Sequence, residues 1–258
     1  MKPRFAAAAA VNDHQVLHQC LSASPDVASG ALALRTYEGF RSAAAAYNRA
    51  LEETDAEILI LVHQDVYLPR GYVARLDAAV RQLDGIAPDW AVAGVVGADK
   101  DGVLHGHVWS TGVGNVIGGD GALPAQVETL DEMILLIRTS TGLRFDEELP
   151  GFHLYAADII QIAAAAGFTT WVVDAPAVHH SRPVINLGGG YKQAWYYMRR
   201  KWRDRLPIPN LVCPITPSPL KVLEKDIRIR IKHRGRARRG SIAPEEPAAI
   251  AARLGFDA

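Results

Sequence analysis

Residues 57–68, with the sequence EILILVHQDVYL, decide the fold. Ile58 to Val62 form an unbroken apolar run, which predicts a strand covered on both faces rather than a half-solvated one. His63, Gln64 and Asp65 follow at once. Ligands of open parallel sheets bind beyond the carboxyl ends of the strands, so Asp65 is a candidate metal ligand. The alternative for Asp65 alone is a cap or turn ahead of the next helix.

Apolar strands and amphipathic helices alternate on both sides of this stretch. Segments of helical length between apolar strands predict a mostly parallel sheet with right-handed crossovers, flanked by helices. The predicted strands are residues 5–11, 31–36, 58–62, 90–96, 133–137 and 169–173, and the predicted helices include 42–53, 72–83, 158–166 and 191–205.

The 258 residues suit one α/β domain with an extension, because 49% apolar and 22% charged residues are ordinary for a globular protein. The total charge is zero, yet residues 191–240 hold 15 Lys or Arg against three acids, a charge of +12. We therefore expect a domain over residues 1–205. Residues 206–258 would be a Pro-rich connector and a basic C-terminal tail.

The apolar runs and the charge distribution of the sequence limit where the protein is located and what it binds. No apolar run reaches the roughly 20 residues that span a bilayer. The run Phe5–Val11 is short, rich in Ala and better explained as a strand than as a signal peptide, which predicts a cytoplasmic protein. The basic tail is either solvated or a peripheral contact with the anionic inner face of a membrane. Nucleic-acid binding is not expected, since no zinc-finger or basic-zipper pattern is present.

Polar residues at other predicted strand ends have two explanations each. Asn12 and Asp13 end the first strand, where Asp13 either binds a ligand or caps the next helix. Asp158 opens a helix, where the helix dipole favours an acid. His179 and His180 follow the last strand and could complete a metal site with Asp65. No Walker loop or GxSxG elbow is present, and Gly112, Gly114 and Gly118 miss the dinucleotide fingerprint by one position.

Four segments in this order resemble the inverting glycosyltransferases of the second sequence family, in a branch whose strand ends in His-Gln-Asp-Val. They are SAAAAYNRALEETDAEILILVHQDVYLP, WAVAGVVG, FDEELPGFHLYAADI and WVVDAPAVHHS, and together they span most of residues 5–182. The resemblance implies a GT-A (Rossmann-like) fold. It also implies a metal-dependent inverting transfer of a sugar from a nucleotide-sugar donor to a glycan, a lipid-linked acceptor or another hydroxyl, as in bacterial glycan biosynthesis.

The resemblance also implies roles for individual residues. Asp65 matches the final Asp of the metal motif, and His63 stands where its first Asp is usual, so the donor identity stays open. His179, or alternatively His180, would be the additional ligand of Mn²⁺ or Mg²⁺. Asp158 matches the general base. The donor contacts would come from Asn12, Asp13, Asn48, His63 and Gln64.

The acceptor side would be lined by the glycine-rich segment 97–124 and by residues 145–155. Trp109, Phe152 and Tyr155 are candidate sugar-stacking residues, with packing in the core as the alternative for each. Glu147 would bind acceptor hydroxyls or be a solvated loop charge. A catalytically silent protein that binds nucleotide sugars or glycans on the same scaffold is the alternative function.

Overall fold

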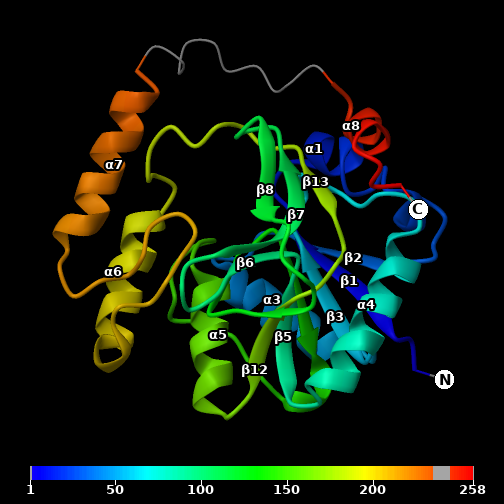
Figure 1. The fold of residues 1–258 in the computed structure, drawn as a ribbon, viewed down its shortest axis with the longest axis horizontal. Coiled ribbons are helices and arrows are strands. Elements are labelled where there is room, and N and C mark those ends of the chain that lie inside the picture. Colours follow the sequence, from blue (N-terminus) through cyan, green and yellow to red (C-terminus); the bar gives the residue numbers. More distant parts are fainter. Residues whose placement is uncertain (1, 235–244, 258) are drawn as a thin grey trace.

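The computed structural model describes residues 2–234 and 245–257, and its centre is a seven-stranded sheet (Figure 1). The strand order is β2-β1-β3-β11-β5-β12-β9. The neighbours β2, β1 and β3 are parallel, as are β5 and β12, whereas β11 runs antiparallel to β3 and β5. The predicted fold class, a parallel-rich α/β sheet flanked by helices, is therefore confirmed. The strands of this sheet are β1 (Phe5–Ala10), β2 (Leu34–Tyr37), β3 (Ile58–Val62), β5 (Trp90–Gly94), β9 (Ala125–Gln126), β11 (Ile134–Arg138) and β12 (Thr169–Val172).

Helices cover both faces of this sheet and form two cores. Leu59 and Leu61 of β3 pack into the core under α3 and α5, whereas Ile58, Ile60 and Val62 pack into the core under α1 and α4. This two-sided burial is the physical reason for the unbroken apolar run. The helices are α1 (His14–Gln19), α2 (Pro25–Ala28), α3 (Ala43–Glu53), α4 (Tyr72–Ile86) and α5 (Tyr155–Ala165), with a 3₁₀ turn η1 (Thr139–Thr141).

A second sheet stands above the carboxyl ends of the parallel strands (Figure 1). Its order is β10-β6-β7-β13-β4, with β8 paired to β7. The glycine-rich segment supplies the β7–β8 hairpin, in which a Cβ on Gly118 would overlap the carbonyl oxygen of Gly106. The sequence did not predict this sheet, because its strands are short and broken by glycine. They are β4 (Val66–Tyr67), β6 (Val96–Ala98), β7 (Leu104–Ser110), β8 (Asn115–Gly119), β10 (Thr129–Leu130) and β13 (Ala177–His179).

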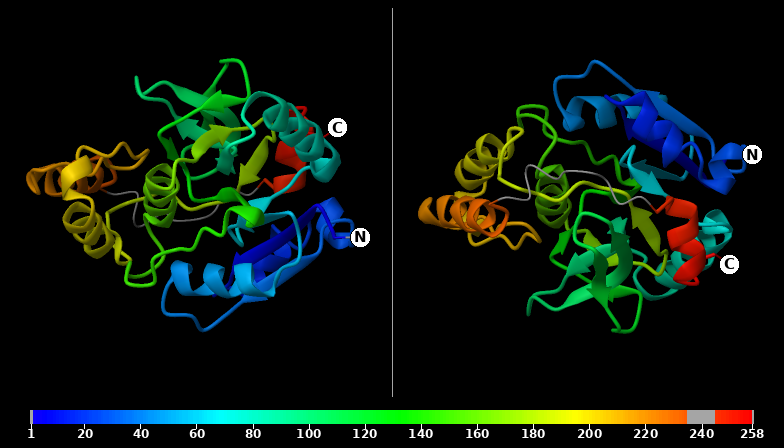
Figure 2. Two further views of the ribbon diagram at one scale, coloured as in Figure 1. Left: turned by 90° about the horizontal axis from the view of Figure 1, so that it is seen from below. Right: turned by 90° about the horizontal axis from the view of Figure 1, so that it is seen from above.

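The C-terminal region contains helices that the sequence did not predict. After α6 (Tyr191–Lys201) and the 3₁₀ turn η2 (Arg203–Arg205), the chain forms α7 (Leu220–Lys232) beside α6 at the outer edge of the molecule (Figures 1 and 2). The last helix, α8 (Pro247–Arg253), returns to the other side and packs on β13 through Ile250 and Ala251. The predicted basic tail therefore includes a packed helix, and its residues 235–240 lie outside the described part of the chain. None of the described helices combines the length and the apolar composition needed to cross a membrane.

Candidate functional site

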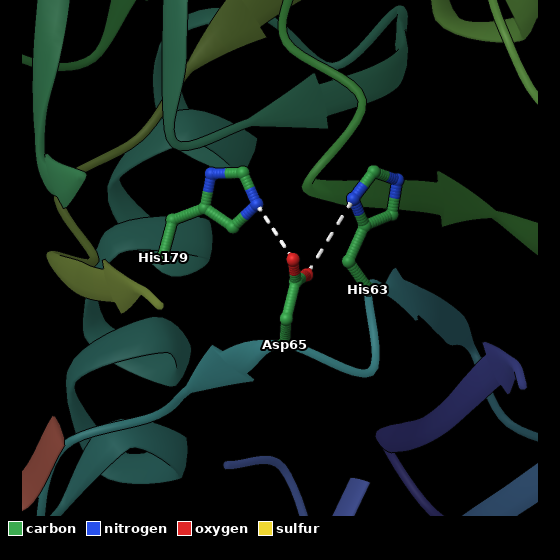
Figure 3. A group of neighbouring side chains, drawn as sticks. All are labelled: His63, Asp65 and His179. Carbon is green, nitrogen blue, oxygen red and sulfur yellow. Dashed lines mark ion pairs between the residues drawn. The ribbon is translucent and has the colours of Figure 1, made fainter. Parts of the chain in front are cut away.

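A cluster of three possible metal ligands forms where β3 ends (Figure 3). His63 and Asp65 belong to the turn between β3 and β4, and β4 pairs with β13 so that His179 lies opposite Val66. His179 Nε2 is 3.3 Å from Asp65 Oδ2, and His63 Nδ1 is 4.0 Å from Asp65 Oδ1. The three ligand atoms lie within 4.8 Å of one another. We call His63, Asp65 and His179 the cation cluster.

The hydrogen bonds of His63 orient its ring for metal binding. The Tyr155 hydroxyl donates its proton to the Glu132 carbonyl oxygen at 2.8 Å, so its oxygen can only accept from His63 Nε2, also at 2.8 Å. His63 Nδ1 then carries a lone pair and faces Asp65 (Figure 3). Such an outer hydrogen bond fixes the tautomer of metal-binding histidines in proteins.

The protonation of the cluster follows from burial and from its own charges. Burial alone would raise the pKa of Asp65, but His179 and His63 outweigh it and lower that pKa to about 2. Burial lowers the pKa of His63, with partial opposition from Asp65. Burial also acts to lower the pKa of His179, yet the adjacent Asp65 carboxylate outweighs it and raises that pKa. The carboxylate is thus ionised throughout the neutral range.

The donor set of the cluster fits a divalent cation. A carboxylate and two imidazoles within one ligand sphere suit Mn²⁺ better than Mg²⁺, which prefers oxygen ligands. The lone pair of His63 directed at the cluster adds to this fit. His63, Asp65 and His179 are therefore the residues that would hold a metal ion.

His180 lies next to the cluster but turns its ring away. Its backbone N–H donates to the Asp65 carbonyl oxygen at 2.8 Å, and its ring Nδ1 is 3.9 Å from Cys20 Sγ. Successive side chains of a strand point to opposite faces, so only one of the two histidines can face Asp65. His180 supports the backbone of the cluster, and the ring that lies beside Asp65 is that of His179.

A hollow of about 360 Å³ opens beside the cluster at the carboxyl ends of β1, β2 and β3. Gln64 ties two of these ends together, because its Nε2 donates to Asn12 Oδ1 at 2.6 Å and its Oε1 accepts from the Asn12 and Asp13 backbone. We call this space the first hollow. It is lined by Ala10, Val11, Asn12, Tyr37, Gly39, Phe40, Tyr47, His63, Gln64, Asp65, Phe152 and Tyr155.

Two of the predicted donor contacts lie outside the first hollow. Asp13 accepts from the Val16 backbone N–H at 3.1 Å and caps α1, which is the alternative given above. Asn48 is buried, donates to the Phe145 carbonyl oxygen at 2.9 Å and accepts from the Phe145 N–H at 2.8 Å. Its polar side chain in α3 therefore braces the segment that leads to α5, and does not face a ligand.

The residues predicted to contact the acceptor do not lie together in one site. Phe152 and Tyr155 line the first hollow, on the side expected for the donor. Trp109 packs between the C-terminal helix and β13, with the Arg253 guanidinium 5.2 Å from its ring. Glu147 accepts from Asn48 Nδ2 at 3.1 Å and pairs with Arg41 at 3.6 Å. Trp109 and Glu147 thus have structural partners of their own.

Asp158 lies in a buried ion-pair network instead of the first hollow. Its carboxylate is 1% exposed, and it accepts from Lys201 Nζ at 2.8 Å and from Trp202 Nε1 at 2.7 Å. Lys201 also pairs with Asp146 at 2.6 Å. Burial raises the pKa of Asp158, and the Lys201 ammonium only partly opposes it. Both carboxylate oxygens are occupied, so the arrangement does not suit a general base and ties α5 to α6.

A larger hollow of about 580 Å³ lies on the His179 side of the cation cluster. Asp131 supplies its carboxylate, while Arg182 and three cations of α7 make it strongly basic. No local pattern revealed Asp131, which simply precedes a buried strand. We call this space the second hollow; its polar lining residues are Ser110, Asp131, His179, Ser181, Arg182, Lys225, Arg228, Lys232 and His233, and its apolar ones include Leu104, Val113, Ile117, Met133, Val184, Leu211, Val212 and Ile229.

The sequence of residues 7–201 matches the model of a glycosyltransferase-like family. The chain belongs to this family. The predicted class of activity, glycosyl transfer, is confirmed at that level.

Other similar proteins were found by sequence and by structure. A protein of Fuscovulum blasticum described as ATP synthase subunits region ORF 6 is 30% identical over 172 residues, 65% of this chain and 68% of that protein. The mannosyltransferase PcManGT from Pyrobaculum calidifontis, solved with GDP-Man and Mn²⁺, is 16% identical with a TM-score of 0.44, covering 99% of this chain and 80% of that one. TarS of S. aureus is 12% identical with a TM-score of 0.43, covering 90% and 72%. The family assignment rests on the sequence match.

Proposed function

We propose that this protein is a metal-dependent inverting glycosyltransferase that moves a sugar from a nucleotide-sugar donor to a hydroxyl of a glycan or lipid-linked acceptor. The observation that carries the proposal is the cation cluster between two hollows. His63 and Asp65 border the first hollow, and His179 borders the second. A donor and an acceptor bound on the two sides would meet at the cluster.

The first hollow is the donor site of this proposal. It lies where parallel strands end, as ligand sites of open α/β sheets do. Asn12 and Gln64 offer amide groups, and Phe40 and Phe152 offer apolar surface for a base or sugar. Mn²⁺ or Mg²⁺ held by the cluster would neutralise charge on the diphosphate that leaves.

The second hollow is the acceptor site, and Asp131 is the candidate general base. It is the carboxylate of that hollow among the described residues, and one of its oxygens is held by the Met133 backbone N–H at 3.0 Å. A positioned carboxylate that takes the proton of an attacking hydroxyl contributes about 10²–10⁴-fold in rate. Attack from the side opposite the leaving diphosphate, in one displacement, inverts the anomeric centre.

We propose that the chain consists of a catalytic domain and a C-terminal extension. Residues 1–205 form the catalytic domain, in agreement with the family match over 7–201. Residues 206–258 form a C-terminal extension that packs on this domain and supplies α7 to the second hollow. We propose a cytoplasmic enzyme whose basic extension contacts the inner face of the membrane, as its charge favours.

The test is metal-dependent donor binding and turnover. Nucleotide sugars should raise the melting temperature in the presence of Mn²⁺, and slow hydrolysis of one of them should follow. Asp65→Ala should abolish both effects. Asp174→Ala is the matched control, because Asp174 also follows a strand, β12, but is exposed and lies outside the cluster. Metal-dependent binding without hydrolysis or transfer would favour the silent binding protein, and no binding under any metal would refute the proposal.

A further inference from the structure

Helix α7 is held in one orientation by its inner face. Val222 is buried in the core under α5 and α6, and Ile229 packs against it. Asp226, 6% exposed, accepts from Lys192 at 2.9 Å, from Arg230 at 3.1 Å and from the Leu187 backbone N–H at 2.8 Å. Which side chains of α7 face outward is therefore fixed by the fold.

The outer face of α7 is a stripe of large aliphatic side chains. Leu220, Leu223, Ile227 and Ile231 are 69%, 41%, 56% and 60% exposed. Their spacings of three, four and four residues place them on one face of the helix. Single exposed aliphatic residues are common, but four in a row on one helix mark an interaction surface. We call these four residues the α7 stripe.

Basic side chains flank the α7 stripe. The helix carries Lys221, Lys225, Arg228, Arg230 and Lys232. Its two acids pair with two of these cations, Glu224 with Arg228 at 2.5 Å and the buried Asp226 with Arg230 at 3.1 Å, so the helix keeps an excess of three positive charges. An exposed apolar stripe between cations is the pattern of helices that lie in the interface of anionic membranes.

We propose that α7 is a membrane-docking helix, with the α7 stripe at the boundary between headgroups and acyl chains and the flanking cations on anionic headgroups. The position of α7 at the outer edge of the molecule leaves it accessible to a flat surface (Figures 1 and 2). A burial depth of about 5–10 Å is typical of such helices, and nearby Lys and Arg side chains strengthen the attraction to anionic lipids.

The docking helix also defines the class of acceptor, and this step rests on the proposed function. Lys225, Arg228 and Lys232 of α7 line the second hollow together with Asp131 and His179. A hollow walled by the docking helix would open beside the membrane. Its mixture of cations and apolar side chains suits a lipid-anchored acceptor that carries a phosphate group near the reacting hydroxyl.

The test is flotation of the full chain with vesicles of phosphatidylcholine, with and without phosphatidylglycerol. The wild type should bind vesicles that contain phosphatidylglycerol. Ile227→Ser with Ile231→Ser should weaken binding at least about tenfold, as expected when two buried aliphatic side chains are lost. The matched control is Ile86→Ser with Val103→Ser, since these residues are 56% and 55% exposed and lie elsewhere. Leu220→Ser with Leu223→Ser, a second pair from the stripe, repeats the test if the first variant folds poorly.

Three results would overturn the proposal. Equal binding of both stripe variants and the control would leave charge alone as the cause. Failure of the wild type to bind any vesicle would exclude a membrane as the partner of α7. A dimer that the stripe variants dissociate, without vesicle binding, would make a second copy the occupant. Donor binding is measured without vesicles, so its failure would refute the proposed function while leaving the docking helix intact.

Discussion

The two hollows beside the cation cluster are built from different kinds of structure. The first hollow is bounded by the ends of three adjacent parallel strands, and Gln64 and Tyr155 hold its polar groups by short hydrogen bonds. The second hollow is bounded by the β7–β8 hairpin, by the segment after β13 and by α7. One side depends on the central sheet, whereas the other depends on elements added to it.

This difference suggests that the two hollows bind different parts of the reaction. A site at the edge of a central sheet keeps its geometry, which suits a nucleotide diphosphate common to many enzymes. A site walled by added elements can differ between relatives, which suits a variable acceptor. The segment 131–133 lies between the two hollows: Asp131 lines the second, while the Glu132 carbonyl oxygen accepts from Tyr155, which lines the first.

The largest expected effect comes from the carboxylate of the second hollow. Asp131→Asn should lower transfer by about 10²–10⁴-fold, the contribution of a positioned general base. Metal-dependent binding of the nucleotide sugar should persist, because Asp131 is not part of the first hollow. Steady-state kinetics measures the loss of transfer, and a thermal shift on the same sample measures the binding of the nucleotide sugar. Loss of donor binding together with transfer would show that the two hollows do not act separately.

Asp158 offers the next test, because it should matter for stability and not for the chemistry of either hollow. Asp158→Asn leaves Lys201 with Asp146 as its remaining acid, so we expect a loss of about 3 kcal/mol in unfolding free energy, the lower end for a broken buried pair. Urea unfolding measures it. Asp204→Asn, from an exposed pair with Arg203, should cost about 0–1 kcal/mol.

A result of the opposite kind would restore the assignment that the family resemblance implies. If Asp158→Asn keeps its stability but loses transfer by orders of magnitude, Asp158 acts on the substrate. The Lys201 pair would then have to open during the reaction.

Substitution of Tyr155 tests whether its hydroxyl orients His63 for metal binding. Tyr155→Phe removes the hydroxyl that fixes the tautomer of His63, and loss of such an outer hydrogen bond weakens metal affinity by about 10–100-fold. Calorimetric titration with Mn²⁺ measures the affinity of each variant. Tyr72→Phe is the control, since the buried Tyr72 hydroxyl has no hydrogen-bond partner among the described residues and Tyr72 is not a member of the cluster. Equal affinities in the two variants would mean that the hydroxyl does not orient His63.

Sequence reasoning succeeded where a single strand decides the position of a residue. The place of Asp65 beyond the end of β3 was predicted, because a strand covered on both faces can place polar side chains only beyond its apolar run. The choice between His179 and His180 depends on the pairing of β13 with β4, which no local pattern shows. Asp158 and Lys201 are 43 residues apart in sequence, so the network that occupies Asp158 could not be predicted either.

The C-terminal region shows why the added elements are hard to predict. Ile227, Ile229 and Ile231 alternate with basic residues as in a strand, yet they lie in helix α7. Ile229 packs inward while Ile227 and Ile231 face out, because the helical turn puts them on different sides. The helix places Val222 and Ile229 in the core that also holds Trp195 and Met198 of α6, and this long-range packing is not visible in the local pattern.

A pH dependence of stability is expected from Glu132 in the wall between the hollows. Burial and the neighbouring Asp131 raise the pKa of Glu132 to about 8, from 4.5 in an unfolded chain. The folded protein therefore holds this proton more tightly, so stability should fall as the pH rises from about 4.5 to about 8. Glu132→Gln should remove this slope and leave the variant more stable than the wild type at pH 8, because the variant has no buried carboxyl group to ionise.

Urea unfolding of both proteins at several pH values checks the sign as well as the size. Glu148→Gln is the control, because Glu148 is exposed in the loop before α5. An unchanged slope in Glu132→Gln would mean that Glu132 is ionised in the folded state and that solvent reaches the wall between the hollows. The donor and acceptor sites would then share one hydrated space, and the separate effects expected for Asp131→Asn and Tyr155→Phe should merge.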